Sequence, residues 1–208
     1  AQGTLITVSG DLRLKASGVS SLNNITVQGQ LSYLAQTQGA VFTHAPGSQV
    51  ISGSVTIGEE ASLSLEPTQS SDNQTLFILT NHWTNLGHLE AGDSKVEFTT
   101  PSPSVISGDN TFHDFYVVAP EKTIEFESGK TQDFTGTFTL QGSYGKLLNI
   151  RSTQSNIPWI IQGVNTSDIK FTSLQDTVYV YAHGPPTLDI QHSKNLGNNS
   201  NLSFQELI

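Results

Sequence analysis

The sequence predicts an all-β chain folded as a right-handed parallel β-helix, a solenoid in which coils of strand stack on one another. Two observations carry this prediction. Short alternations of apolar and polar residues, each interrupted by glycine, follow one another along the 208 residues, and no stretch has the period of a helix. The composition agrees, because Thr, Val, Ile and Phe suit strands and charged residues make up only 13% of the chain.

A loose unit recurs in the order apolar, x, Gly, x, apolar, x, apolar. It occupies residues 8–14, 27–33, 51–57, 106–112 and 134–140, with a weaker copy at 85–91. The central glycines Gly10, Gly29, Gly53, Gly87, Gly108 and Gly136 are separated by steps of 19, 24, 34, 21 and 28 residues. Such irregular steps are typical of solenoid coils whose loops differ in length around a common core. We expect these glycines at corners with positive φ, and Asn110 in a place that is apolar in the other copies.

A β-sandwich is the alternative fold, since it also contains short alternating strands separated by frequent turns. The repeated glycine unit favours the solenoid, because a sandwich does not require it. We predict one domain over residues 1–208, with first coils at 1–80, a repeat-like segment at 81–194 and a C-terminal tail at 195–208.

Composition excludes several functional classes. The formal net charge of −9 disfavours nucleic acid, whose phosphates would be repelled. Without cysteine the chain has neither disulfides nor thiolate metal sites. We find no apolar run that could span a bilayer and no leader pattern at the start, and therefore expect a mature product or a segment of a longer chain.

The second part of the chain contains a series of short motifs, which lie in order at residues 83–87, 91–98, 108–115, 122–126, 129–132, 136–140, 148–152, 158–159, 174–176 and 197–199. In the order of these motifs it resembles a repeat segment of very large secreted and cell-surface proteins of bacteria and archaea. The resemblance covers about residues 81 to 200, and residues 200–204 depart from it by lacking the expected aromatic closure. It implies a right-handed parallel β-helix in adhesin-like, stalk-like or fibre-like proteins, with no established catalytic residues to transfer.

We therefore expect a secreted, non-catalytic structural module: a rigid rod or a subunit of an extracellular or cell-surface filament. Its expected partners are further copies of itself or neighbouring solenoid domains, joined end to end, because open solenoid ends expose strand edges and core. One alternative is an adhesin that binds glycans. Another is a polysaccharide lyase or hydrolase of the β-helix type.

An enzyme of that type would need two carboxyl groups facing each other across one groove. Asp109 and Asp114 are the best local pair, with Lys95 and Lys122 as candidate basic residues. The aspartates are scattered beside Gly, Asn or Ser, which is typical of turns, so we predict no catalytic residues and no cofactor.

No metal site is predicted either. The histidines lack zinc-ligand spacing, and weak calcium binding by loop carboxylates is the only metal chemistry that we retain. His88 and His113 hold similar places in their repeat units and are expected to pair on an outer face.

Aromatic residues suggest a second kind of site. We expect Trp83, Trp159 and Tyr144 to fill the core or cap loops, as large aromatics in solenoids commonly do. Tyr179 and Tyr181 share one strand face with Thr177 and form the candidate ligand surface for a glycan.

Five sequons of the form Asn-x-Ser/Thr are candidate glycosylation sites. They begin at Asn24, Asn73, Asn165, Asn198 and Asn201, with Asn73 and Asn198 in predicted loops. This number does not clearly exceed the number expected by chance, so the sequons are a weak signal of glycosylation.

Overall fold

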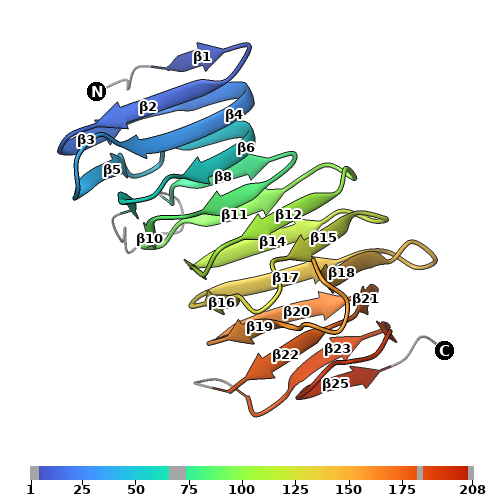
Figure 1. Ribbon diagram of the computed structural model, residues 1–208. Helices are drawn as coiled ribbons and strands as arrows, with labels where there is room; N and C mark the ends of the chain where they lie inside the picture. Colours follow the sequence, from blue (N-terminus) through green and yellow to red (C-terminus); the bar gives the residue numbers. More distant parts are fainter. Residues whose placement is uncertain (1–4, 66–73, 182–184, 206–208) are drawn as a thin grey trace.

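The computed structural model describes residues 5–65, 74–181 and 185–205, and within these ranges the chain is a parallel β-helix of about eight turns. Figure 1 shows the turns stacked in sequence order from the N-terminus to the C-terminus. Strand ladders between turns are parallel, which is why the solenoid prediction is confirmed and the antiparallel sandwich is wrong. The described residues include no helix of the length and apolarity that a membrane-spanning helix requires.

Each complete turn contributes one strand to each of three faces, which we call faces 1, 2 and 3. Face 1 holds β1 (Ile6–Val8), the first halves of β4 (Ile25–Ala35) and β6 (Gln49–Ile57), β8 (Leu76–Leu79), β11 (Lys95–Phe98), β14 (Asp114–Val118), β17 (Thr137–Gln141), β20 (Thr166–Lys170), β23 (Leu188–Gln191) and β25 (Leu202–Gln205).

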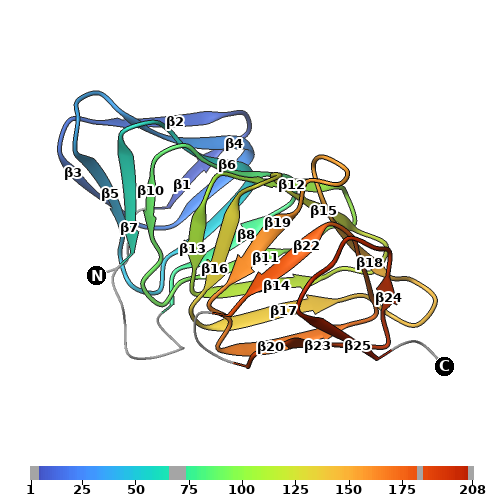
Figure 2. The same cartoon turned by 60° about the horizontal axis from the view of Figure 1, so that its bottom comes forward.

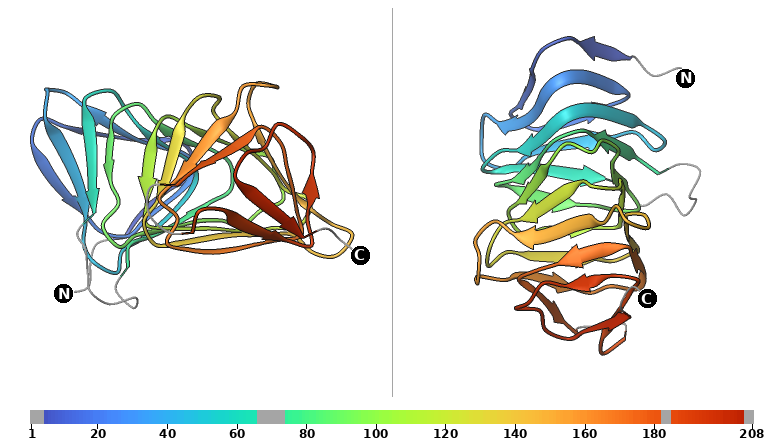
Figure 3. Two further views of the ribbon diagram at one scale, coloured as in Figure 1. Left: turned by 90° about the horizontal axis from the view of Figure 1, so that it is seen from below. Right: turned by 90° about the vertical axis from the view of Figure 1, so that its right-hand side faces the viewer.

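Face 2 holds β2 (Leu12–Ala16), the second halves of β4 and β6, β9 (Trp83–Asn85), β12 (Ser104–Ser107), β15 (Thr123–Phe126), β18 (Leu148–Ser152), β21 (Thr172–Leu174) and β24 (Lys194–Asn195). Face 3 holds β3 (Val19–Leu22), β5 (Ala40–His44), β7 (Ala61–Leu65), β10 (His88–Glu90), β13 (Asn110–Phe112), β16 (Thr131–Phe134), β19 (Trp159–Gln162) and β22 (Thr177–Val180). Figure 2 shows face 3 as a row of strands, and Figure 3 shows the stack from two further sides. Residues 195–205 continue this stacking, so the described part of the C-terminal tail belongs to the solenoid.

The core fills the space between the faces with every second side chain of each strand. Phe, Trp, Leu, Ile and Val residues point inward and are almost fully buried along the middle of the stack. Trp83 and Trp159 are both completely buried, as predicted, and Trp159 stacks on Phe126 with 3.8 Å between ring centroids. Successive turns therefore place aromatic rings in contact along the axis, which adds to the stabilisation that apolar burial provides.

The repeat glycines lie at corners, but the reason for glycine is mostly not positive φ. Of the six repeat glycines only Gly108 has positive φ, at 83°. Four of the others, Gly29, Gly53, Gly87 and Gly136, are confined by close approach of the preceding turn: a Cβ on Gly53 would lie 2.6 Å from the carbonyl oxygen of Gly29. Gly10 has no such contact. The predicted reason is therefore wrong for most of them, since contact between turns, rather than the local turn conformation, excludes a side chain.

The corner that carries the glycine changes along the stack. Gly29 and Gly53 separate face 1 from face 2, Gly87 and Gly108 separate face 2 from face 3, and Gly136 separates face 3 from face 1. The longer steps of 34 and 28 residues are those in which the glycine moves on by one corner. The irregular period thus has a geometric cause in addition to variable loops.

Gly53→Ala should destabilise the fold, whereas Gly10→Ala should have little effect. The new methyl group at residue 53 would overlap the backbone of the preceding turn, while a Cβ at Gly10 meets no atom within 4 Å. We expect Gly53→Ala to lower the free energy of unfolding by about 1–3 kcal/mol, measured by urea denaturation. Equal stability of the two variants would contradict the close-approach explanation.

Candidate functional site

Face 3 is interrupted between β10 and β13. Its strands form two separate four-stranded sheets, β3-β5-β7-β10 and β13-β16-β19-β22. The same two turns remain paired on face 1, through β11 and β14, and on face 2, through β9 and β12. The opening is therefore confined to one side of the solenoid.

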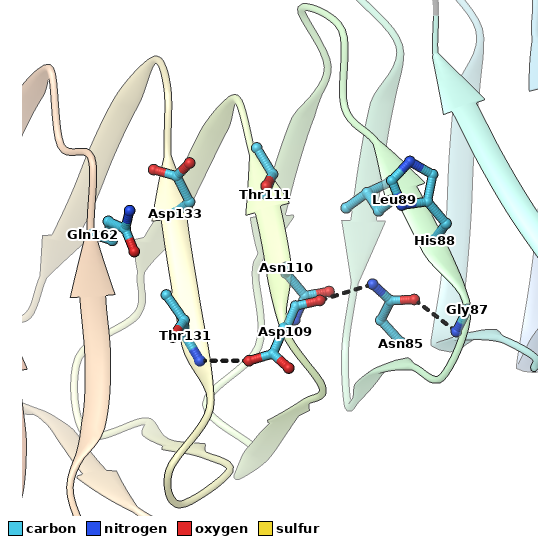
Figure 4. Close-up of a pocket in the computed structure, with 10 residues that line it drawn as sticks. All are labelled: Asn85, Gly87, His88, Leu89, Asp109, Asn110, Thr111, Thr131, Asp133 and Gln162. Carbon is cyan, nitrogen blue, oxygen red and sulfur yellow. Dashed lines mark hydrogen bonds between the residues drawn. The ribbon is translucent and has the colours of Figure 1, made fainter. Parts of the chain in front are cut away.

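A cavity of about 380 Å³ lies at this interruption, and a second of about 320 Å³ adjoins it. The two share Asn85, Gly87 and Asp109, and we call them together the face-3 groove. Figure 4 shows the larger cavity, whose polar side chains come from both sides of the interruption. These side chains are His88 on β10, Asp109 and Thr111 at β13, Thr131 and Asp133 on β16, and Gln162 on β19.

The base of the groove is held by side-chain amides. Asn85 Nδ2 donates to the Asp109 carbonyl at 3.0 Å, and Asn85 Oδ1 accepts from the Gly87 amide at 3.1 Å (Figure 4). Gly108 allows this contact, because a Cβ there would lie 2.0 Å from the Asn85 carbonyl oxygen. The two turns thus touch at the corner between faces 2 and 3 and separate along β10 and β13.

A buried polar ladder runs beneath this corner. Trp83 Nε1 donates to Asn110 Oδ1 at 2.9 Å, and Asn110 Nδ2 donates to Gln132 Oε1 at 2.9 Å. Gln132 Nε2 in turn donates to the Gly108 carbonyl at 2.8 Å. Asn110 therefore takes an inward place, as its position in the repeat predicted, and its hydrogen bonds offset the cost of burying an amide.

Asp109 is a structural carboxylate at the rim of the groove. Its Oδ1 accepts from the Thr131 amide at 2.9 Å, and its Oδ2 accepts from Lys130 Nζ at 3.0 Å. Although burial alone would raise the pKa of Asp109, the bonds from Thr131 and Lys130 hold it below the usual value. Asp109 therefore carries a charge that Lys130 balances.

The structure does not bring the candidate catalytic residues into one constellation. Asp114 lies at the other end of β13 from Asp109, and its Oδ1 accepts from the Thr137 amide at 2.7 Å. Lys95 pairs with Glu97 at 3.1 Å on the outer surface of β11. Both aspartates accept a hydrogen bond from a backbone amide of the following turn of the solenoid, which explains why they lie at its corners.

Lys122 is the second candidate basic residue, and it is completely buried. Its Nζ donates to the Ser102 carbonyl and lies 5.5 Å from the centroid of the Phe98 ring. Burial lowers the pKa of Lys122 from 10.5 to about 8. The Lys122 side chain therefore packs inside the solenoid against Ser102 and Phe98 and is closed off from solvent.

Lys122→Met should stabilise the protein and change its pH dependence. Because the folded pKa lies below the unfolded value, the folded chain binds fewer protons between about pH 8 and 10.5, and stability rises with pH there. Below that window the buried charge opposes folding. We expect the variant to gain about 1–3 kcal/mol at pH 7 and to lose the rise, measured by urea denaturation at several pH values.

The control for this experiment is Lys146→Met, which removes an exposed lysine paired with Glu121 at 3.1 Å. It should leave the pH profile above pH 8 unchanged. A profile in which Lys122→Met retains the wild-type rise would show that Lys122 is not the group responsible.

His88 and His113 do not hold equivalent places. His88 begins β10, is exposed and lies 3.6 Å from the Glu90 carboxylate. It lines the groove. His113 follows the end of β13, where its ring leaves no room for a Cβ on Gly136. The expected pair is therefore wrong, because the two residues occupy opposite ends of their strands.

The predicted tyrosine surface is also not formed as expected. Tyr179 is fully buried and its hydroxyl donates to the Pro185 carbonyl at 2.9 Å, whereas Tyr181 is 58% exposed. The alternation that placed them on one face ends with β22 at Val180, so Tyr181 no longer follows the strand. Only Tyr181 stays a candidate for ligand contact. Tyr144 is 77% exposed and does not fill the core.

The candidate glycosylation residues lie at corners. Asn24, Asn165, Asn198 and Asn201 are exposed, and each makes a side-chain hydrogen bond to another turn. Asn73 lies outside the described residues. Glycosylation at these positions stays a prediction.

Within the described residues, no group of three or more His, Asp or Glu side chains is arranged to hold a metal ion. Comparison of the chain with protein-family models, with curated proteins and with solved structures finds no match. The interpretation of the site therefore depends on its geometry. Sequence reasoning missed the groove, and no motif in the sequence marks it.

Proposed function

We propose that this protein is a non-catalytic structural module, a rigid rod of the cell surface or extracellular space that continues end to end with further solenoid units. The observation that carries the proposal is the state of the two terminal turns. Elsewhere the inward apolar side chains are almost fully buried, but at both ends they are only partly covered.

The N-terminal turn exposes part of a complete apolar layer. Ile6 and Val8 on β1, Leu12 and Leu14 on β2, and Leu22 on β3 point toward the core and remain partly accessible. At the other end, Leu202 and Phe204 on β25 do the same. Apolar surface of this kind, bordered by strand edges, favours contact with another layer of the same architecture.

The resemblance to repeat segments of adhesin-like and fibre-like surface proteins supports the extracellular location and the structural role. The hydrogen bonds that Asp109 and Asp114 accept from backbone amides support a non-catalytic role, since both carboxylates already hold neighbouring turns together. Further copies of this chain, or neighbouring solenoid domains, are the partners that we propose.

Phe204→Asp should weaken self-assembly, while Val118→Asp should not. Phe204 lies on the last described strand, whereas Val118 is 55% exposed at the end of β14 in the middle of the stack. We expect wild-type protein to form rods that lengthen with concentration in negative-stain electron microscopy and sedimentation velocity. The end variant should raise the dissociation constant roughly a hundredfold, equal to about 2.7 kcal/mol.

Wild-type protein that stays monodisperse at high concentration would argue against assembly through copies of this chain. Assembly by Phe204→Asp equal to that of Val118→Asp would place the contact elsewhere than at this end.

A further inference from the structure

In the face-3 groove, β10 and β13 are too far apart to form a strand ladder and too close to admit a third strand between them. Cα atoms of β10 and β13 approach within 8 Å, yet no ladder joins these strands. Paired strands lie about 4.8 Å apart, and a strand inserted between them would need neighbours about 9.6 Å apart. The opening therefore suits a single layer of small polar groups, such as hydroxyls.

Polar side chains of different kinds line the opening between β10 and β13. Thr111 and Asp133 are in register on neighbouring strands, and Gln162 follows Asp133 on the next strand. His88 stands on the other side of the opening (Figure 4). A hydroxyl, a carboxylate, an amide and an imidazole together offer both donors and acceptors within one small cavity.

The charges of the groove favour a neutral ligand over an anionic one. The Asp109 carboxylate is balanced by Lys130 at 3.0 Å, and Glu127 Oε2 accepts from the Gly108 amide at 2.8 Å. With Asp133 added, acidic side chains outnumber the single lysine of the groove. Phosphates and acidic sugars would meet like charge here, whereas sugar hydroxyls can bond to carboxylates without that repulsion.

We infer that the face-3 groove binds a neutral, hydroxyl-rich ligand the size of a mono- or disaccharide. The cavities of about 380 and 320 Å³ have the size of small-molecule sites. Three residues of β10 span about 10 Å, which is enough for two sugar rings. None of the described lining residues is Phe, Tyr or Trp, so the affinity comes from hydrogen bonds and is modest.

This inference does not depend on end-to-end assembly, because the groove lies in the middle of the stack between β10 and β13. It also differs from the tyrosine surface predicted from the sequence, which lies at the end of β22. A rod with such a site would hold sugar along its side while its ends join other units.

The test is a titration followed by amide chemical shifts in NMR spectra of the ¹⁵N-labelled protein. The probes are cellobiose, maltose and lactose as neutral sugars, digalacturonate as an acidic sugar, and the peptide Val-Thr-Val-Thr. At least one neutral sugar should shift the amides of Gly87, His88 and Thr111 in a saturable manner. Digalacturonate and the peptide should leave these amides unchanged.

Matched variants locate the binding. Thr111→Trp fills the opening from β13 with an exposed side chain, and should weaken sugar binding about tenfold or more. Thr43→Trp makes the same change on β5, on the same face but away from the opening, and should leave binding unchanged. His88→Ala removes a hydrogen-bonding group from the opposite side and should weaken binding without a bulky substitution.

Three outcomes would overturn the inference. These are the absence of saturable shifts with all three neutral sugars, equal binding by Thr111→Trp and Thr43→Trp, and preferential binding of digalacturonate. Saturable shifts with the peptide alone would instead assign the opening to a strand-like partner.

Discussion

Neighbouring turns of a parallel β-helix are held about 4.8 Å apart by their backbone hydrogen bonds, and much of this structure follows from that spacing. It leaves no room for a side chain where two corners meet, so Gly53 and Gly108 lie against carbonyl groups of the preceding turn. It also places like residues on like along the axis, as with Phe112 and Phe134, which are in register on β13 and β16 and stack with 6.1 Å between ring centroids.

The same spacing explains the polar residues at the corners. A backbone amide at a corner leaves the ladder and needs another acceptor. Asp109, Asp114 and Asn24 each accept from an amide of the following turn at 2.7 to 2.9 Å. Residues that resemble candidate catalytic acids or glycosylation sites in the sequence therefore have a structural task, which sequence inspection alone does not distinguish from chemistry.

The architecture could be predicted from the sequence because alternation and glycine punctuation are local signals. The inward place of Asn110 followed from the same pattern, and the burial of Trp83 and Trp159 followed from the tendency of large aromatics to fill solenoid cores. The face-3 groove could not be predicted, because it is the absence of pairing between strands about twenty residues apart, and no single residue type marks it. Tyr179 was misplaced because alternation groups it with Thr177 on one face without saying that this face points inward.

The interruption of face 3 also sets the direction in which the solenoid should bend most easily. Across β10 and β13 the turns are joined by ladders on two faces instead of three. A bending force meets least resistance when it opens the unjoined side, with faces 1 and 2 acting as the pivot. Within the described residues we therefore expect bending to widen this side first, while the buried core on either side stays closed.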